Sequence, residues 1–223
     1  MLYRIALALI LGVGLARPAA AQPRVFADAF GLLSVQTSTP PGSEPSLAPL
    51  GVAGTAFGAG ASLNVLFPSG WSIGGELSVP ARIVSTVDVT YVTRYQIENR
   101  YREPMLSVLV RYHALRGSRA GIDVGGGASV AWQSTIQRRA DAIGTFPFSG
   151  GFGPFGPSTE YTSTTLALTI AADLPITLST HVALVPAMRV HVVSRPSDSQ
   201  DPLWYLGVDR FVYRPSVGVR MRL

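Results

Sequence analysis

The chain has 223 residues, a formal net charge of +5 and no cysteine. Neither a disulfide framework nor a thiolate metal site is therefore possible. All basic residues are arginine, scattered along the chain without a basic block or a nucleic-acid-binding motif, so we expect no nucleic-acid partner.

The first residues are typical of an export signal. Arg4 supplies a positive charge, an apolar run follows over Ile5–Ala16, and Ala19–Ala21 provides the small residues that signal peptidase needs. The run is shorter than the roughly 20 residues of a membrane-spanning helix. We therefore predict a cleaved signal peptide over 1–21 and one mature domain over 22–223.

Alternation of apolar and polar residues dominates the rest of the chain, which is typical of strands with one apolar face. In the last such segment, Val217, Val219 and Met221 lie on one face, whereas Arg220 and Arg222 lie on the other. Each segment exceeds the roughly 9–11 residues of a tilted membrane strand. The eight predicted strands are Arg24–Thr37, Thr55–Phe67, Trp71–Val84, Pro104–Leu115, Gly121–Gln137, Tyr161–Leu174, Thr180–Ser194 and Gly207–Leu223.

Short and long connections alternate strictly between these segments. The short ones are Pro68–Gly70, Arg116–Ala120 and about five residues around Pro175. The long ones are Ser38–Gly54, Ser85–Glu103, Arg138–Glu160 and Arg195–Leu206. In an up-and-down barrel this pattern puts all long loops at one rim, as in bacterial outer-membrane barrels with short periplasmic turns. We therefore predict an all-β fold, an eight-stranded antiparallel up-and-down transmembrane β-barrel.

The architecture resembles the small outer-membrane β-barrel proteins, the group that contains the OmpA-like transmembrane domain and the OmpX- and OmpW-like barrels. The resemblance covers nearly the whole mature chain and rests on the signal, the eight segments and the terminal strand Phe211–Leu223. It implies the outer membrane of a Gram-negative-type bacterium, contact with outer-membrane lipids and lipopolysaccharide, and recognition by the barrel-assembly machinery. We also expect a monomer. Such proteins usually end in an aromatic residue, where this chain has Leu223.

Aromatic residues near the ends of the segments fit the girdles of a membrane barrel. They are Phe67, Trp71, Tyr112, Trp132, Phe211 and Tyr213.

Eight strands enclose an interior that side chains can fill, so the inward polar residues are expected to form a packed lumen network. The candidates are Glu76, Arg111, His113, Asp123, His181, Arg189, His191, Arg220 and Arg222. Glu76 and Arg111 are expected to pair, and His113 and Asp123 to face one another across a short turn. Arg189 is expected to lie higher on its strand. Either these charges satisfy one another, or Glu76 exchanges arginine partners and acts as a gate.

Nothing in the sequence indicates catalysis or a cofactor. No G-x-S-x-G, H-E-x-x-H or Gly-rich phosphate loop occurs. His191 and Ser194 lie on opposite faces of a strand because side chains alternate with period two. Three scattered histidines are a weak basis for a metal site, and we expect none.

The arginine- and tyrosine-rich connection over 85–103 suits either surface recognition or a solvated loop, and 144–157 is rich in Phe, Gly and Pro. We expect a structural or surface-interaction protein. One alternative is a narrow channel or a binding pocket for a small hydrophobic molecule. The other is a soluble secreted lipocalin-like barrel with its apolar faces turned inward, which alternation alone does not exclude.

Overall fold

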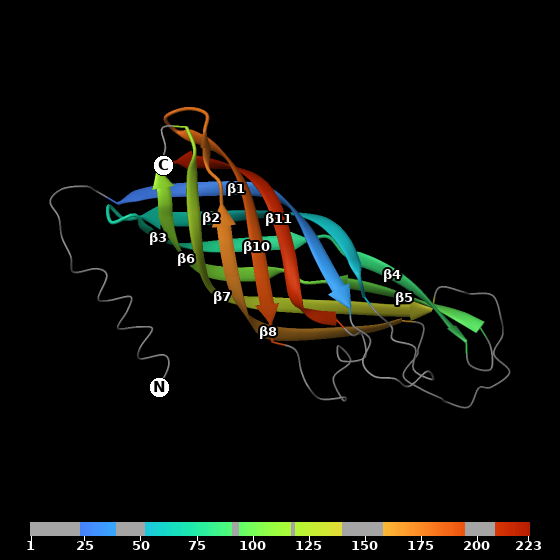
Figure 1. The fold of residues 1–223 in the computed structure, drawn as a ribbon. Helices are drawn as coiled ribbons and strands as arrows, with labels where there is room; N and C mark the ends of the chain where they lie inside the picture. The colour runs from blue at the N-terminus through green and yellow to red at the C-terminus, as the bar shows by residue number, and fades with distance from the viewer. Residues whose placement is uncertain (1–22, 39–51, 91–93, 117–118, 140–157, 195–207) are drawn as a thin grey trace, which may run out of the picture.

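The computed structural model describes residues 23–38, 52–90, 94–116, 119–139, 158–194 and 208–223 (Figure 1). The predicted signal peptide and most of the predicted long connections lie outside these residues. No helix in the described ranges has the length and apolarity needed to cross a membrane. The strands are β1 (Arg24–Ser38), β2 (Gly54–Leu66), β3 (Trp71–Pro80), β4 (Ile83–Thr90), β5 (Arg94–Arg102), β6 (Met105–Arg116), β7 (Gly121–Arg139), β8 (Ser158–Asp173), β9 (Ile176–Thr177), β10 (Val182–Val193) and β11 (Val208–Arg222).

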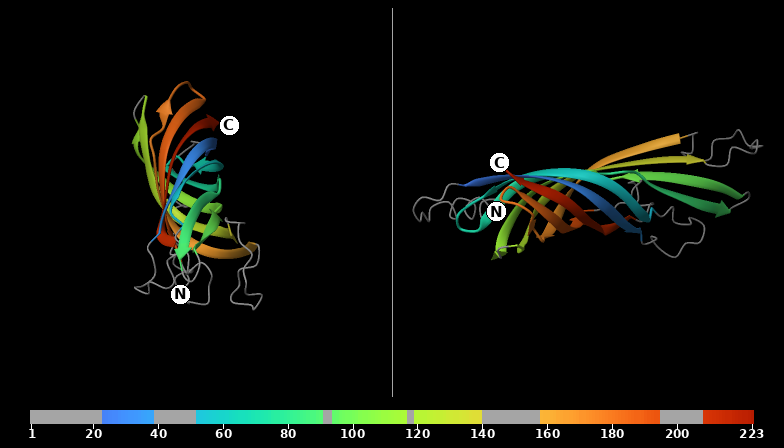
Figure 2. Two further views of the ribbon diagram at one scale, coloured as in Figure 1. Left: turned by 90° about the vertical axis from the view of Figure 1, so that its right-hand side faces the viewer. Right: turned by 90° about the horizontal axis from the view of Figure 1, so that it is seen from above.

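These strands form a sheet that closes on itself. Its order is β4-β5-β7-β6-β3-β2-β1-β11-β10-β8, and a further pairing joins β7 to β8. The closed ring therefore consists of β1, β2, β3, β6, β7, β8, β10 and β11, each antiparallel to its neighbours. Figures 1 and 2 show these strands running at a tilt around the ring. The predicted eight-stranded antiparallel up-and-down barrel is confirmed.

The predicted connection Ser85–Glu103 is not a loop. The third barrel strand continues past a kink after Pro80 as β4, and the chain returns as β5 before β6 begins. β4 and β5 pair from Ile83↔Tyr101 to Thr90↔Arg94, and β5 also pairs with β7. The sequence of β4 is rich in valine, isoleucine and threonine, which favour strands, so the alternation continues where we predicted that it ends. The hairpin projects from the end of the barrel remote from the C-terminus (Figure 1).

The short turns gather at the opposite end. In the first, the Phe67 N–H donates to the Trp71 carbonyl at 2.8 Å, and the Gly70 N–H donates to the Phe67 carbonyl at 3.0 Å. Gly70 has a φ of 92°, a left-handed conformation that glycine adopts without steric cost. Antiparallel pairing then places the strand ends that flank the longer connections at the other rim, which is the polarity that the sequence predicted.

The outer wall of the barrel is apolar. Exposed fractions are 79% at Phe57, 68% at Leu166 and Leu168, 56% at Val108 and 55% at Val217. The residues between them on the same strands face inward and are buried. The described strands therefore do not have the inverted arrangement of a soluble lipocalin-like barrel.

Exposed aromatic side chains lie at both ends of this wall. Near the short turns, Trp71 and Tyr112 occupy paired positions with ring centroids 5.0 Å apart, and Phe67 lies beside the first turn. Trp132 and Phe211 are exposed toward the other end of the ring. Two aromatic bands of this kind are typical of membrane barrels.

Gly60 leaves room for an inward aromatic ring. Phe30 on β1 pairs with Gly60 on one side and Gly218 on the other, and a Cβ built on Gly60 would collide with the Phe30 ring. We expect Gly60→Val to lower the free energy of unfolding by about 1–3 kcal/mol through overpacking. Urea unfolding of the detergent-refolded protein measures this change. Gly75→Val is the control because a Cβ there meets nothing within 4 Å, and an equal loss in both variants would contradict the expectation.

Candidate functional site

Charged side chains from seven strands meet inside the barrel. Because alternate residues of each strand face inward, one or two charges per strand suffice to fill the lumen. The acidic members are Asp28 (β1), Glu76 (β3), Asp123 (β7) and Asp173 (β8). The basic members are Arg111 (β6), Arg189 (β10) and Arg220 (β11). We call these seven residues the lumen cluster.

Glu76 lies at the centre of the cluster and binds two arginines at once. Arg111 Nη2 lies 2.8 Å from Glu76 Oε2. Arg189 Nε lies 3.0 Å from Oε1, and its Nη2 lies 2.9 Å from Oε2, so this pair is bidentate. Arg111 Nη1 also donates to Asn64 Oδ1 at 2.5 Å.

The expected height of Arg189 was wrong. It lies at the level of Glu76 although the two strands are not neighbours in the ring. The expected height was obtained by counting residues from the turns, which takes no account of strand tilt and stagger. In addition, the long side chain of Arg189 spans the narrow lumen. The gate hypothesis has Glu76 exchange one arginine partner for another. In the structure Glu76 contacts Arg111 and Arg189 at the same time.

Asp173 and Arg220 extend the cluster toward the short turns. Asp173 accepts from Arg189 Nη1 at 2.5 Å and from Arg220 Nη2 at 3.3 Å. Arg220 in turn donates from Nε to Asp28 at 2.8 Å and from Nη1 to Asp123 at 2.9 Å. The three arginines therefore link carboxylates from four strands across the lumen.

His113 joins the cluster through Asp123. The two residues are paired across β6 and β7, and His113 Nδ1 lies 2.6 Å from Asp123 Oδ1. His113 therefore adds a second side chain of β6 to the contacts of the cluster.

Three other sequence candidates lie outside the cluster. Arg222 follows the inward Arg220 by two residues, so alternation places it on the lumen side. However, β11 ends at Arg222 and its side chain is exposed at the rim. His181 is also exposed, and its Nδ1 lies 2.8 Å from the hydroxyl of Thr180. His191 is buried, and its Nδ1 lies 2.8 Å from the hydroxyl of Thr169. A hydroxyl chain continues from Thr169 to Ser129 and Ser107 at 2.5 and 2.7 Å.

A second charged layer lies beyond this hydroxyl chain. Arg214 donates from Nη1 to Ser78 Oγ and from Nη2 to the Glu103 carbonyl, both at 2.5 Å. Gln133 Nε2 donates to Glu103 Oε1 at 2.7 Å. Neither was a sequence candidate. Glu103 was assigned to a predicted connection, whereas Arg214 lies on the same inward side of β11 as Arg220, so the alternation of that strand could have found it.

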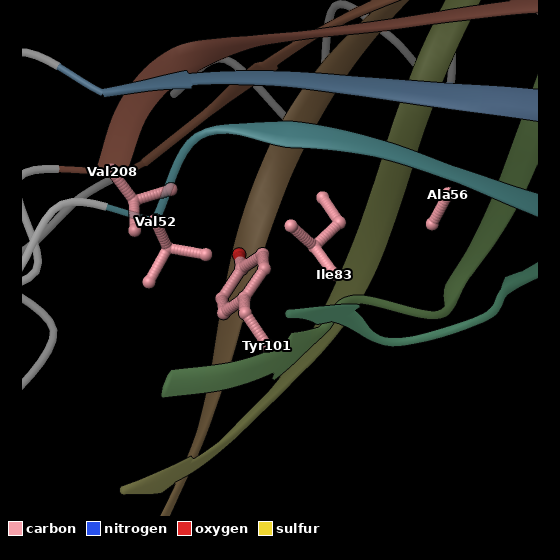
Figure 3. Close-up of a cluster of buried hydrophobic side chains, with 5 residues drawn as sticks. All are labelled: Val52, Ala56, Ile83, Tyr101 and Val208. Atoms are coloured by element: carbon pink, nitrogen blue, oxygen red, sulfur yellow. The ribbon is translucent and has the colours of Figure 1, made fainter. Parts of the chain in front are cut away.

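Apolar side chains occupy the lumen around this layer and between it and the rim remote from the short turns. Met105, Ala131, Ala167, Val193 and Val212 form one buried cluster. Val52, Ala56, Ile83, Tyr101 and Val208 form a second cluster, of which Val52, Ile83 and Tyr101 point toward one another in Figure 3. We call this second cluster the apolar cap. Among the described residues, no group of three or more His, Asp or Glu is placed to hold a metal ion.

The fold is that of small outer-membrane barrels, the class that the sequence resembles. A major outer membrane protein from Thermus thermophilus superposes with a TM-score of 0.57 at 10% identity, covering 91% of this chain and all of that one. Neisserial surface protein A gives 0.54 at 10% identity, with the same coverage. Ail, the attachment invasion locus protein of Yersinia pestis, gives 0.51 at 12% identity, again with the same coverage.

No protein-family model and no curated protein sequence matches the chain.

Proposed function

We propose that this chain is a bacterial outer-membrane β-barrel with a closed lumen, which acts as a structural or surface-interaction protein. It is neither an enzyme nor a channel. The observation that carries the proposal is the combination of an apolar outer wall with a lumen crossed by direct ion pairs. We expect it to contact outer-membrane lipids and lipopolysaccharide. We also expect it to be inserted by the barrel-assembly machinery and to be a monomer.

The height of the apolar wall supports a membrane location. On β7 the outward positions from Ile122 to Trp132 span ten residue steps, or about 33 Å along the strand at roughly 3.3 Å per residue. A tilt of about 40° reduces this length to about 25 Å, the height of the apolar band of outer-membrane barrels. All backbone groups of such a closed ring can pair within the protein, as lipid requires.

Heat modifiability tests the membrane barrel. We expect the protein of the outer-membrane fraction to migrate faster on an SDS gel before boiling than after it, because a closed barrel resists SDS until it is heated. A single band position, together with recovery in the soluble periplasmic fraction, would contradict the proposal.

The packing of the lumen argues against conduction. An ion path past Glu76 would have to separate it from both Arg111 and Arg189, and leaving one buried charge unpaired costs several kcal/mol. At the other end, Val52 and Tyr101 of the apolar cap are 0% and 1% exposed, which also counts against a pocket for a hydrophobic molecule there.

Planar-bilayer recording tests the closed lumen. We expect the reconstituted wild-type barrel to give no discrete conductance steps, and a large porin added to the same bilayer verifies that insertion events are detectable. Reproducible steps from the purified barrel would contradict the closed lumen and favour the gate at Glu76.

A further inference from the structure

A groove on the outer wall combines two arginines with an aromatic ring. It lies at the edge of the apolar band that is remote from the short turns. Its volume is about 390 Å³, and its lining includes Arg82, Arg102, Trp132, Ser134, Thr162 and Thr164. It lies where the barrel strands bend into the β4–β5 hairpin, outside the lumen cluster. We propose that this groove binds a phosphate of the lipid A headgroup in the outer leaflet. This inference rests on the proposed membrane location of the barrel.

The kink in the chain directs the arginines outward. Alternation is broken after Pro80, so that Ile83 still faces inward while Arg82 is exposed. Arg102 lies between the buried Tyr101 and Glu103 and faces outward, and its Nε donates to the Pro80 carbonyl at 3.0 Å. This bond joins the two kinked segments that carry the arginines.

Strand register places hydroxyl groups beside the arginines. Arg102 pairs with Ser134 on β7, and Ser134 pairs with Thr162 on β8. Two residues closer to the short turns, Trp132 pairs with Thr164. Guanidinium and hydroxyl groups are the donors that recognise phosphate oxygens, and arginine binds them in a bidentate geometry.

The depth of the groove favours a lipid over a soluble anion. Along β8, the outward residues change from Leu166 and Leu168, each 68% exposed, to Thr164 and Thr162. Trp132, at the same level as Thr164, is 42% exposed, and tryptophan prefers the boundary between hydrocarbon and headgroups. The groove therefore opens at headgroup height, at the rim where outer-membrane barrels face the exterior.

Other charges near the groove set the design of the test. Glu98 and Arg100 on β5 pair with each other at 2.5 Å. Glu160 accepts a hydrogen bond from Ser134 at 3.2 Å and is exposed next to Thr162 on the outward side of β8. Its negative charge opposes a bound phosphate. Neutralising Glu160 should therefore strengthen binding, whereas neutralising Arg82 or Arg102 should weaken it.

Native mass spectrometry of the barrel in a zwitterionic detergent can measure the binding of bisphosphorylated lipid A. We expect Arg82→Gln and Arg102→Gln each to weaken binding about tenfold, the typical effect of losing one charge-assisted hydrogen bond. Arg210 is an exposed arginine on β11, and Arg210→Gln is the matched control that should leave binding unchanged. Glu160→Gln should strengthen binding. Dephosphorylated lipid A should bind weakly to every form.

Equal binding by all variants, or equal binding of phosphorylated and dephosphorylated lipid A, would overturn the inference. Displacement of the lipid by an equal concentration of inorganic phosphate would also overturn it, because it would indicate a simple anion site. Each variant is first tested for heat modifiability. A variant that passes this test without the binding change refutes the groove alone, whereas a wild-type chain that fails it refutes the proposed membrane barrel.

Discussion

Replacing Glu76 by Gln is expected to lower the free energy of unfolding by about 3–5 kcal/mol, because the variant leaves buried Arg111 and Arg189 without their shared carboxylate. Amide and carboxylate have nearly the same shape, so the loss reports charge and not packing. Urea unfolding of the barrel refolded in detergent, followed by tryptophan fluorescence, measures it.

Glu160→Gln is the control for this experiment, since it removes one negative charge from an exposed position on β8. We expect it to change the stability by less than about 0.5 kcal/mol. Equal stabilities of Glu76→Gln and the wild type would mean that the lumen cluster does not hold the barrel together.

Replacing Val108 by Arg is expected to destabilise the membrane-embedded barrel by about 2–4 kcal/mol. Val108 is 56% exposed on the outer wall and pairs with Ala128 of β7, inside the apolar band between Ile122 and Trp132, so a guanidinium there would face the bilayer interior. Unfolding of the protein from lipid vesicles in denaturant measures the change.

Leu178→Arg is the matched control, because Leu178 is 64% exposed but lies in the short turn between β9 and β10. A charge there can reach water or headgroups, and the expected cost is under about 1 kcal/mol. Similar small effects at both positions would indicate that the outer wall faces water.

The fold was largely predictable because the sheet has a simple repeat. Alternation places one set of residues on each face, and three short turns fix the polarity of the connections. The β4–β5 hairpin was missed for a specific reason. The predicted strand Trp71–Val84 crosses the kink around Ala81 and Arg82 but was ended at Val84, and the polar and charged residues over 85–103 were interpreted as a loop although β4 keeps strand-forming residues.

The lumen cluster was predictable only in part. Glu76 with Arg111, and His113 with Asp123, are on neighbouring strands, where distance from a short turn sets the level. Asp28 and Asp173 were missed, although the alternation of β1 and β8 turns both inward. Contacts across the lumen, such as Arg189 with Glu76, depend on strand tilt and stagger, which no local sequence pattern records.

Cysteine labelling of β8 tests the central claim most directly, because the chain has no cysteine of its own. Single cysteines would replace the outward Leu166, Leu168 and Ile170 and the buried Ala167 and Ala171, in protein folded into vesicles. We predict that the outward cysteines react with a lipid-soluble maleimide and not with a charged thiosulfonate, and that the inward ones react with neither reagent until the barrel is unfolded. Fast reaction of the outward cysteines with the charged reagent would contradict a membrane-spanning barrel.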